Sequence, residues 1–151
     1  MTGTITPNRV HSQLGNDELA EFLSNLTFLS RPIIRKWFRS GLAIEWKPDD
    51  SPVTTADKSV EKVLREAISK RFPDDTILGE EHPAQHGSGE GGYSWVIDPI
   101  DGTRAFVSGR PIFGTLIGLV QGNQPIAGFI DMPILDETYV SVGGQTTLNG
   151  T

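Results

Sequence analysis

The sequence reads Trp95-Val-Ile-Asp98-Pro-Ile-Asp101-Gly-Thr103 where an apolar run gives way to two aspartates. A short run of aromatic and β-branched residues is typical of a buried strand, and Asp-Pro and Asp-Gly steps are typical of a turn. The carboxylate of Asp98 would therefore emerge at the end of a buried strand, with that of Asp101 close to it. Two carboxylates and a backbone carbonyl form an oxygen ligand set that suits Mg²⁺. An ordinary turn without a ligand is the alternative.

A second acidic pair, Glu80-Glu81, follows the short apolar segment Ile77-Leu-Gly79. By itself this pair could simply be solvated on the surface. If both segments are strands of one sheet, however, their acidic ends could meet in space. Two such groups of carboxylates can hold two metal ions about 3.5–4 Å apart, an arrangement that activates water in phosphoryl hydrolysis.

Small and hydroxyl-bearing residues follow the second aspartate. Gly102 and Thr103 offer backbone N–H groups without obstruction, and a short helix starting there would attract a phosphate at its N-terminus. The Thr103 hydroxyl could orient a water molecule or simply cap the helix. Asp57 could have a similar orienting role without contacting the ligand itself. Thr54-x-x-Asp57 equally matches a capping box at a helix start.

Helical periodicity dominates the first half of the chain. Apolar residues recur at spacings of three and four over residues 17–40 and 56–71, which predicts two helices. We expect the first helix to be kinked near Pro32. Residues 42–46 are expected to form a short strand, and residues 47–52, rich in proline and aspartate, a loop.

The second half of the chain changes to the period of β-strands. Helices first and adjacent strands afterwards predict an α+β fold, in which two N-terminal helices pack on a largely antiparallel sheet. Residues 1–16 would be a flexible N-terminal arm, residues 17–151 one domain, and the glycine-rich segment 83–92 a surface loop without a fixed shape. Strands are expected at residues 76–78, 94–97, 112–120, 125–131 and 138–142, with hairpin turns at 121–124 and 133–136.

Charge and composition narrow the class of partner. The formal net charge is −6 and the pI is about 5.0, which argues against nucleic acid, since a surface that follows phosphates needs clustered Lys and Arg. The chain has no cysteine and no stretch of eighteen apolar residues, so we expect no thiolate site and no membrane contact. A cytoplasmic location is the corresponding expectation.

Three motifs resemble those of a known family: Pro52-Val-Thr-Thr-Ala-Asp57, Gly79-Glu-Glu81, and the stretch from Trp95 to Thr103. They are similar to the N-terminal motifs of the inositol monophosphatase superfamily, which consists of lithium-sensitive, magnesium-dependent phosphatases. The segments 47–57 and 106–117 are more similar to the branch that hydrolyses histidinol phosphate than to the inositol branch. The fold implied is the N-terminal domain of a layered αβαβα, sugar-phosphatase-like architecture.

The resemblance also implies roles for individual residues. It implies magnesium, two or three ions in a complete site, bound by Glu80, Asp98, Asp101 and the carbonyl of Ile100. Ile100, Asp101, Gly102 and Thr103 would bind the substrate phosphate, while Glu80, Thr103 and Asp57 would position and deprotonate the attacking water. Glu81 and Lys47 are expected as further residues of the site.

The implied activity is hydrolysis of a small phosphorylated metabolite, most simply histidinol phosphate to histidinol in histidine biosynthesis, with inositol 1-phosphate as the alternative substrate. Family members are longer, and their C-terminal half supplies a further metal-ligand aspartate and a substrate-selecting surface. By this resemblance the chain looks like a truncated N-terminal domain, which could be slow or inactive alone. A noncatalytic domain that binds metal or a partner is a further alternative. We expect an exposed apolar edge or face near the last strands, and, by analogy with the family, a possible homodimer.

Overall fold

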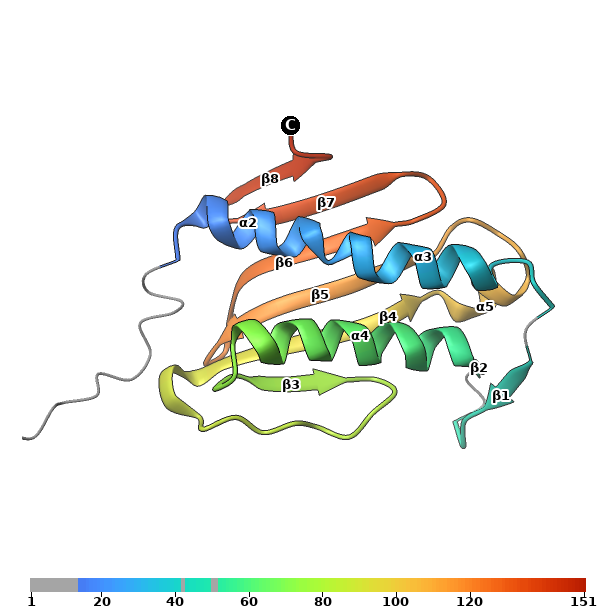
Figure 1. The fold of residues 1–151 in the computed structure, drawn as a ribbon, viewed down its shortest axis with the longest axis horizontal. Coiled ribbons are helices and arrows are strands. Elements are labelled where there is room, and N and C mark those ends of the chain that lie inside the picture. Colours follow the sequence, from blue (N-terminus) through green and yellow to red (C-terminus); the bar gives the residue numbers. More distant parts are fainter. Residues whose placement is uncertain (1–13, 42, 50–51) are drawn as a thin grey trace, which may run out of the picture.

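The structure is a computed structural model that describes residues 14–41, 43–49 and 52–151. Most of the expected N-terminal arm, residues 1–13, lies outside the described residues, as do Leu42 of the expected strand and Asp50 and Ser51 of the expected loop. Helices cover one face of a six-stranded sheet, and a small hairpin stands at its side (Figure 1). No helix in the described ranges is long and apolar enough to cross a membrane.

The sheet confirms the predicted α+β class. Its neighbouring strands run in chain order, the first pair parallel and every later pair antiparallel. Both expected hairpin turns are present, between the third and fourth and between the fourth and fifth of the six strands that follow. The strands are β3 Thr76–Gly79, β4 Tyr93–Asp101, β5 Gly114–Gln121, β6 Gln124–Met132, β7 Glu137–Val142 and β8 Gln145–Leu148.

Two short strands were not expected. The edge strand β8 has only one apolar residue, and the signal for it is the Gly143-Gly144 turn, whose φ angles of 60° and 79° suit a tight hairpin. Strand β2 (Pro52–Thr54) replaces the end of the expected loop and pairs antiparallel with β1 (Ile44–Trp46). Proline is tolerated there because it is the first residue of its strand.

The first helical region is divided into α2 (Asn16–Asn25) and α3 (Thr27–Trp37), so the expected kink near Pro32 is wrong. The interruption lies at Leu26, whose N–H bonds to the carbonyl of Leu23, three residues back. Both leucines are buried, and a tightened turn brings side chains three apart onto one line. Pro32 stays inside α3, where it deprives only the carbonyl of exposed Phe28 of its helical partner.

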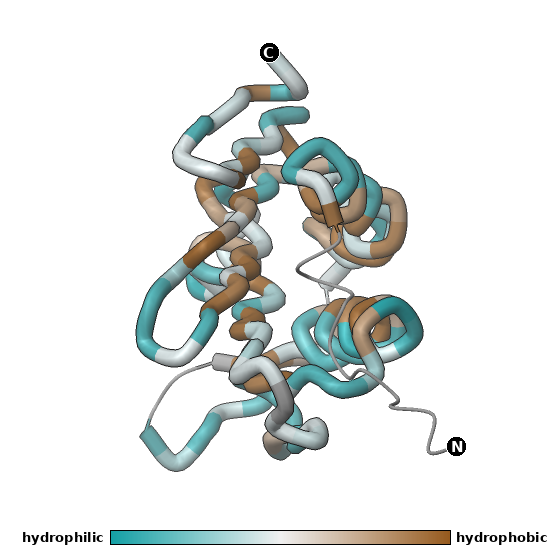
Figure 2. The backbone as a smooth tube through the Cα atoms, turned by 90° about the vertical axis from the view of Figure 1, so that its left-hand side faces the viewer, coloured by the Kyte–Doolittle hydropathy of each residue, from teal (hydrophilic) through white to brown (hydrophobic). Residues whose placement is uncertain are grey.

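The third long helix, α4 (Thr55–Arg71), matches its prediction closely and starts with the expected capping box between Thr54 and Asp57. It lies with α2 and α3 on the same side of the sheet (Figure 2). The strands alternate accordingly. In β4, Trp95 is 0% and Ile97 2% exposed towards the helices, whereas Val96 between them is 45% exposed. The hydrophobic core therefore lies between one sheet face and the helices.

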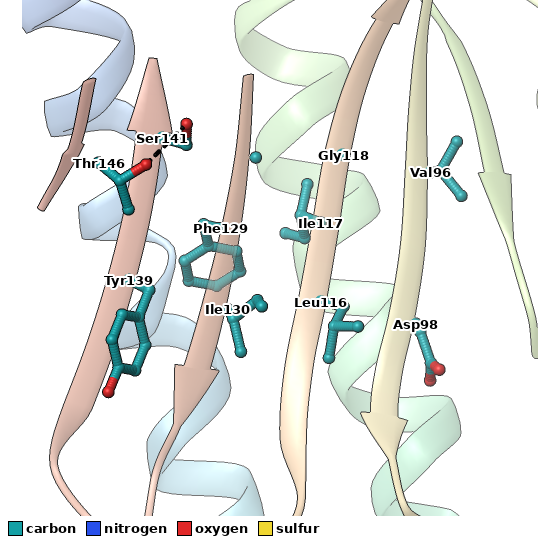
Figure 3. A pocket seen from close by; sticks show the side chains of 11 residues that line it. Val96, Asp98, Leu116, Ile117, Gly118, Phe129, Ile130, Tyr139, Ser141 and Thr146 are labelled. Carbon is teal, nitrogen blue, oxygen red and sulfur yellow. Dashed lines mark hydrogen bonds between the residues drawn. The ribbon is translucent and has the colours of Figure 1, made fainter. Parts of the chain in front are cut away.

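Within the described ranges no element covers the opposite, largely apolar face of the sheet, which confirms the expected exposed face. In the middle of this face Gly118 of β5 and Gly128 of β6 are register partners. Because neither has a side chain, the centre of the face is hollow. The hollow has a volume of about 460 Å³. Figure 3 shows Leu116, Ile130 and Tyr139 along it and Asp98 at its β4 end.

A buried ion pair fixes α3 to the far half of the sheet. Arg31 Nη2 donates to Asp131 Oδ1 at 2.7 Å and to Thr138 Oγ1 at 2.8 Å. The Asp131 side chain is 0% exposed, and its hydrogen bonds to Arg31 raise the pKa of the guanidinium despite burial. Arg31 and Asp131 therefore form a structural ion pair that joins α3 to β6.

The segment 83–92 has a definite course, contrary to the expected shapeless loop. Ile77 and Gln85 exchange both backbone hydrogen bonds, at 2.8 and 2.9 Å. A 3₁₀ turn, η1 (Glu90–Gly92), then leads into β4. The backbone bridge to β3 ties down a segment whose composition alone suggests disorder.

Candidate metal and phosphate site

The parallel pair β3–β4 brings the two acidic segments together. Gly79 is the register partner of Ile97, so Glu80 and Asp98 leave the same edge of the sheet as neighbours. Glu80 lies close enough for its negative charge to act on the carboxyl group of Asp98. The predicted meeting of the two acidic segments is confirmed.

Asp98 is a carboxyl group that resists ionisation in this place. Burial is the largest cause that raises its pKa, and the negative charges of Glu80 and Asp101 raise it further, to about 7. Near neutral pH this site therefore holds a proton or attracts a cation. An excess of carboxylate oxygen is the chemistry that a hard divalent cation neutralises.

A β-bulge separates Asp98 from Asp101. Asp98 faces Leu116 of β5 and Asp101 faces Gly114, so three steps along β4 oppose two along β5. Pro99 cannot donate a hydrogen bond to the ladder, and its carbonyl instead accepts one from Thr115 Oγ1 at 2.8 Å. Asp98 lies on the open face of the sheet by the ordinary alternation of the strand, as Val96 does, and after the bulge Asp101 is exposed at the strand end.

The short helix α5 (Thr103–Val107) starts directly after the bulge, which the sequence offers only as a possibility. Gly102 precedes it with φ at 86°, a conformation that disfavours other residues, and an added Cβ would meet Ile112 O and Phe113 Cβ at 3.4 Å. The first N–H groups of a helix have no preceding turn to bond to, although the N–H of Ala105 here bonds to the carbonyl of Gly102 at 2.8 Å. The turn can therefore present Thr103 to an anion, as expected for a phosphate contact.

Asp57 combines the two roles that the sequence left open. One oxygen, Oδ2, accepts from the backbone N–H of Thr54 at 2.8 Å and from its hydroxyl at 2.5 Å, which completes the capping box. The other, Oδ1, lies 3.1 Å from Thr103 Oγ1. Burial raises the pKa of Asp57, and the hydrogen bonds from Thr54 and Thr103 oppose that shift. Asp57 thus connects the start of α4 to the start of α5.

The Thr103 hydroxyl has two acceptors within reach: Asp57 Oδ1, and the carbonyl oxygen of Ile100 at 2.9 Å. A hydroxyl has a single proton, so it donates to one of them at a time. Its lone pairs remain able to accept a hydrogen bond from a water molecule. The side chain of Ile100 is buried, and its carbonyl is the only part of it that can serve as a ligand.

Lys47 lies among the acidic groups. Its Nζ is 2.8 Å from Glu81 Oε1 and 3.3 Å from Glu80 Oε1. Burial alone would lower the pKa of Lys47, but hydrogen bonds and charges from Glu81 and Glu80 outweigh it and raise the pKa. For Glu81, burial raises the pKa and Lys47 opposes the rise. The ammonium group thus acts as a counter-ion for both glutamates.

The oxygen donors fit a hard divalent cation in kind and in charge. Within the described ranges, no three acidic, histidine or cysteine side chains stand in a ready-made metal-binding arrangement. The closest group is Glu80, Asp98 and Asp101, whose mutual repulsion contributes to the high pKa of Asp98. Glu80 is half exposed and turned partly towards Lys47, so its side chain has room to reorient.

Two residues that the sequence gave no reason to select also reach this region. Glu61 and Arg65 lie one helical turn apart on α4, and the carboxylate of Glu61 accepts from the backbone N–H groups of Glu81 and His82. Their only signal is a charge inside an otherwise apolar helix stripe. An exposed i, i+4 ion pair produces the same pattern, which is why the sequence does not reveal them.

The family model of the inositol monophosphatase family matches residues 15–151. A curated protein of Arabidopsis thaliana, described as a bifunctional phosphatase IMPL2, chloroplastic, is 42% identical over 95% of this chain and 42% of that protein. A histidinol-phosphatase of Chlorobaculum parvum is 43% identical over 85% of this chain and 46% of that protein.

A solved inositol monophosphatase from Zymomonas mobilis has the same arrangement of elements. It is 40% identical and superposes with a TM-score of 0.73 over 91% of this chain and 52% of that chain. The chain therefore spans about half the length of the relatives it matches.

Proposed function

This chain belongs to the inositol monophosphatase family, and we propose that it supplies the metal-binding part of a magnesium-dependent phosphomonoesterase. One observation carries the proposal: Glu80, Asp98 and Asp101 lie together where β3 and β4 end, and burial and the charges of Glu80 and Asp101 raise the pKa of Asp98 to about 7. Such a crowding of carboxylates is costly unless a cation neutralises it. A structural ion pair would contain matching positive charge, but in the described part of the chain Lys47 is paired with Glu80 and Glu81 and not with Asp98 or Asp101.

Four groups would hold magnesium: the carboxylates of Glu80, Asp98 and Asp101 and the carbonyl of Ile100. Bound magnesium, two or three ions in a complete site, would supply an activated water and stabilise the leaving oxygen. The protein would fix the donors through the bulge of β4 and through Thr103, which lies 2.9 Å from the carbonyl oxygen of Ile100. Glu81, which is paired with Lys47, would also belong to this site.

Thr103, Asp57 and Glu80 would prepare the attacking water. When the Thr103 hydroxyl donates to Asp57, its lone pairs can accept a hydrogen bond from water and so orient it. Asp57 is 1% exposed and held by Thr54, so it fixes the direction of that hydroxyl. The half-exposed carboxylate of Glu80 could then take the proton from the water.

The phosphate group would sit at the turn formed by Ile100, Asp101, Gly102 and Thr103. The missing side chain of Gly102 allows close approach of a phosphate oxygen to the backbone. Hydrolysis would break the bond between phosphorus and the ester oxygen, with the water oxygen joining phosphorus and a proton passing to the leaving alcohol. No phosphorylated protein intermediate is needed.

We propose histidinol phosphate as the substrate, with histidinol and phosphate as products. The support is the likeness to a histidinol-phosphatase and the similarity of segments 47–57 and 106–117 to that branch. Inositol 1-phosphate is the second candidate, supported by the likeness to a solved inositol monophosphatase. Because the relatives are about twice as long, the proposal concerns the activity of a complete site, and we expect this chain alone to be slow.

Release of inorganic phosphate from histidinol phosphate and from inositol 1-phosphate, each with Mg²⁺ and with EDTA, tests the proposal. We expect release only with Mg²⁺, faster from histidinol phosphate, and abolished by Asp98→Asn. No release from either substrate at high protein concentration would refute catalysis by this chain. Equal release in EDTA would refute the metal assignment.

Two further proposals concern the location of the protein and its oligomeric state. The absence of cysteine is compatible with the reducing cytoplasm, and fractionation of cells that express the protein tests that location. A homodimer is proposed by analogy with the family. Sedimentation velocity would reveal it as a second boundary that grows with protein concentration.

A further inference from the structure

The Glu61 carboxylate is a fully buried charge that points at the backbone of the acidic segment after β3. The residue is 0% exposed. Its Oε2 accepts the N–H of Glu81 at 2.6 Å, and its Oε1 accepts the N–H of His82 at 3.0 Å. Two consecutive peptide groups are therefore held by one carboxylate, which fixes both their position and their orientation.

Arg65 completes the contact from the next turn of α4. Its Nε donates to Glu61 Oε1 at 2.8 Å, and its Nη2 donates to the carbonyl of His82 at 3.1 Å. The two side chains thus hold the N–H and the C=O of His82 together with the N–H of Glu81. Arg65 also supplies the opposite charge beside the buried carboxylate.

Gly79 makes this approach possible. A Cβ at this position would lie 2.1 Å from Glu61 Oε1, 2.4 Å from its Cδ and 2.8 Å from Arg65 Nη2. These distances are too short for any real contact, so a larger residue would force the pair away. Gly79 directly precedes Glu80, and the acidic segment wraps around the Glu61 carboxylate only because this side chain is absent.

Packing alone does not account for this arrangement. A buried ion pair contributes little net stability compared with an apolar pair of the same volume, because both charges lose their hydration. What an apolar pair cannot do is direct peptide N–H groups. The Arg31–Asp131 pair shows the contrast, because its carboxylate is equally buried but the pair joins side chains of α3 and β6 and, among the described residues, is not hydrogen-bonded to the segment 79–82.

We propose that Glu61 is a positioning residue for the metal site: with Arg65 and Gly79, it fixes the backbone at Glu81 and thereby aims the carboxylates of Glu80 and Glu81. The inference rests on the proposed function, because it assigns a role in magnesium binding to a residue whose own side chain would not bind the ion. Groups that orient metal ligands commonly change affinity ten- to a hundredfold when they are removed.

The test measures Mn²⁺ binding to the metal-free chain by electron paramagnetic resonance, with Mn²⁺ as the spectroscopic probe for a hard-cation site. Glu61→Gln is the main variant, because its amide NH₂ would face donors that need an acceptor. Asp131→Asn is the matched control, a second 0% exposed carboxylate paired with arginine. Circular dichroism and thermal unfolding establish that each variant is folded under the conditions of the titration.

We expect Glu61→Gln to weaken Mn²⁺ binding about ten- to a hundredfold, while Asp131→Asn loses stability but keeps its affinity within about twofold. Unchanged affinity in folded Glu61→Gln would overturn the inference and leave the proposed function standing. Absence of Mn²⁺ binding by the wild-type chain would instead overturn the proposed function. If Glu61→Gln does not fold, Gly79→Ala decides, since it retains both charged residues and displaces them.

Discussion

Asp98 belongs to the small class of carboxyl groups that a fold makes costly to ionise. Its ordinary pKa is 3.8 and its pKa in the folded chain is about 7, mainly because of burial and then because of Glu80 and Asp101. A raised pKa means that the folded state holds the proton more tightly than the unfolded state does. The stabilisation from protonated Asp98 is therefore complete below pH 3.8 and is lost as the pH rises to about 7.

Replacing Asp98 with asparagine should stabilise the metal-free chain. At pH 8 we expect Asp98→Asn to gain about 1 kcal/mol in the free energy of unfolding, allowing for solvent screening of a half-exposed group. This corresponds to a melting temperature higher by roughly 2–4 °C. The gain should vanish at pH 4, where both side chains are neutral.

Differential scanning calorimetry in EDTA at the two pH values measures this difference. Equal melting temperatures of wild type and Asp98→Asn at pH 8 would contradict the repulsion inferred here. With added Mg²⁺ the order should reverse, because only the wild type gains binding energy from the ion.

The sequence is sufficient to predict which carboxylates meet, and insufficient to predict what holds them. Glu80 and Asp98 follow apolar runs, so the sequence pattern shows where their strands end. Pairing of these two successive strands then brings the two carboxylates together. Glu61 is different, because its role depends on Gly79 standing opposite it on another element. The contact of Lys47 with Glu81 likewise depends on where the β1–β2 hairpin lies relative to the main sheet.

At the scale of elements, the residues that cap the start of α4 also contact the candidate metal and phosphate site. Thr54 is the N-cap, and its hydroxyl also donates to the Asp57 oxygen that closes the capping box. Removing this hydroxyl leaves a buried carboxylate with fewer donors and a helix terminus without its cap. Local helix chemistry and the orientation of Thr103 are therefore connected through one side chain.

Thr54→Ala should lower the free energy of unfolding by about 1–2 kcal/mol, the usual cost of losing an N-cap. Thr54→Ser should lose much less, because it keeps the hydroxyl. Urea unfolding followed by circular dichroism measures both. If the alanine and serine variants unfold at the same urea concentration, the hydroxyl contributes nothing and the capping argument fails.

The two misplaced elements show what periodicity cannot supply. The spacing of apolar residues continues smoothly through Leu26, and only the tightened hydrogen bonds reveal two helices. Strand β8 carries almost no apolar pattern and exists because β7 offers it an edge. In both cases tertiary contacts, which a local pattern does not contain, decide the boundary.

The glycines of the open sheet face provide a second prediction at this scale. A Cβ on Gly118 would meet nothing within 4 Å, whereas one on Gly114 would lie 2.9 Å from the carbonyl oxygen of Asp131. Gly118→Ala should therefore leave the free energy of unfolding unchanged or raise it by about 0.4–1 kcal/mol, because it restricts the unfolded chain. Gly114→Ala should lower it. Guanidinium unfolding of both variants distinguishes these outcomes, and a destabilised Gly118→Ala would mean that the face is not open.

For the whole molecule, the main feature is the difference between the two faces of the sheet. The helices α2, α3 and α4 lie on one face (Figure 2), and the other face exposes a row of apolar side chains beside Asp98 (Figure 3). Contiguous apolar patches of this kind are uncommon on monomeric soluble proteins. The relatives are about twice as long as this chain, so their additional residues are the natural candidates to cover such a face.

The exposed face should make the chain bind hydrophobic dyes and associate as its concentration rises. Ile130 lies in the middle of that face and is 46% exposed, so Ile130→Lys should reduce both dye fluorescence and association at little cost in stability. Phe28→Lys is the matched control. It removes a larger side chain that is 75% exposed on α3, on the side of the sheet opposite to the open face. Anilinonaphthalene sulfonate fluorescence and sedimentation velocity measure the two effects. If Phe28→Lys suppressed association as strongly as Ile130→Lys, the open sheet face would not be the surface responsible.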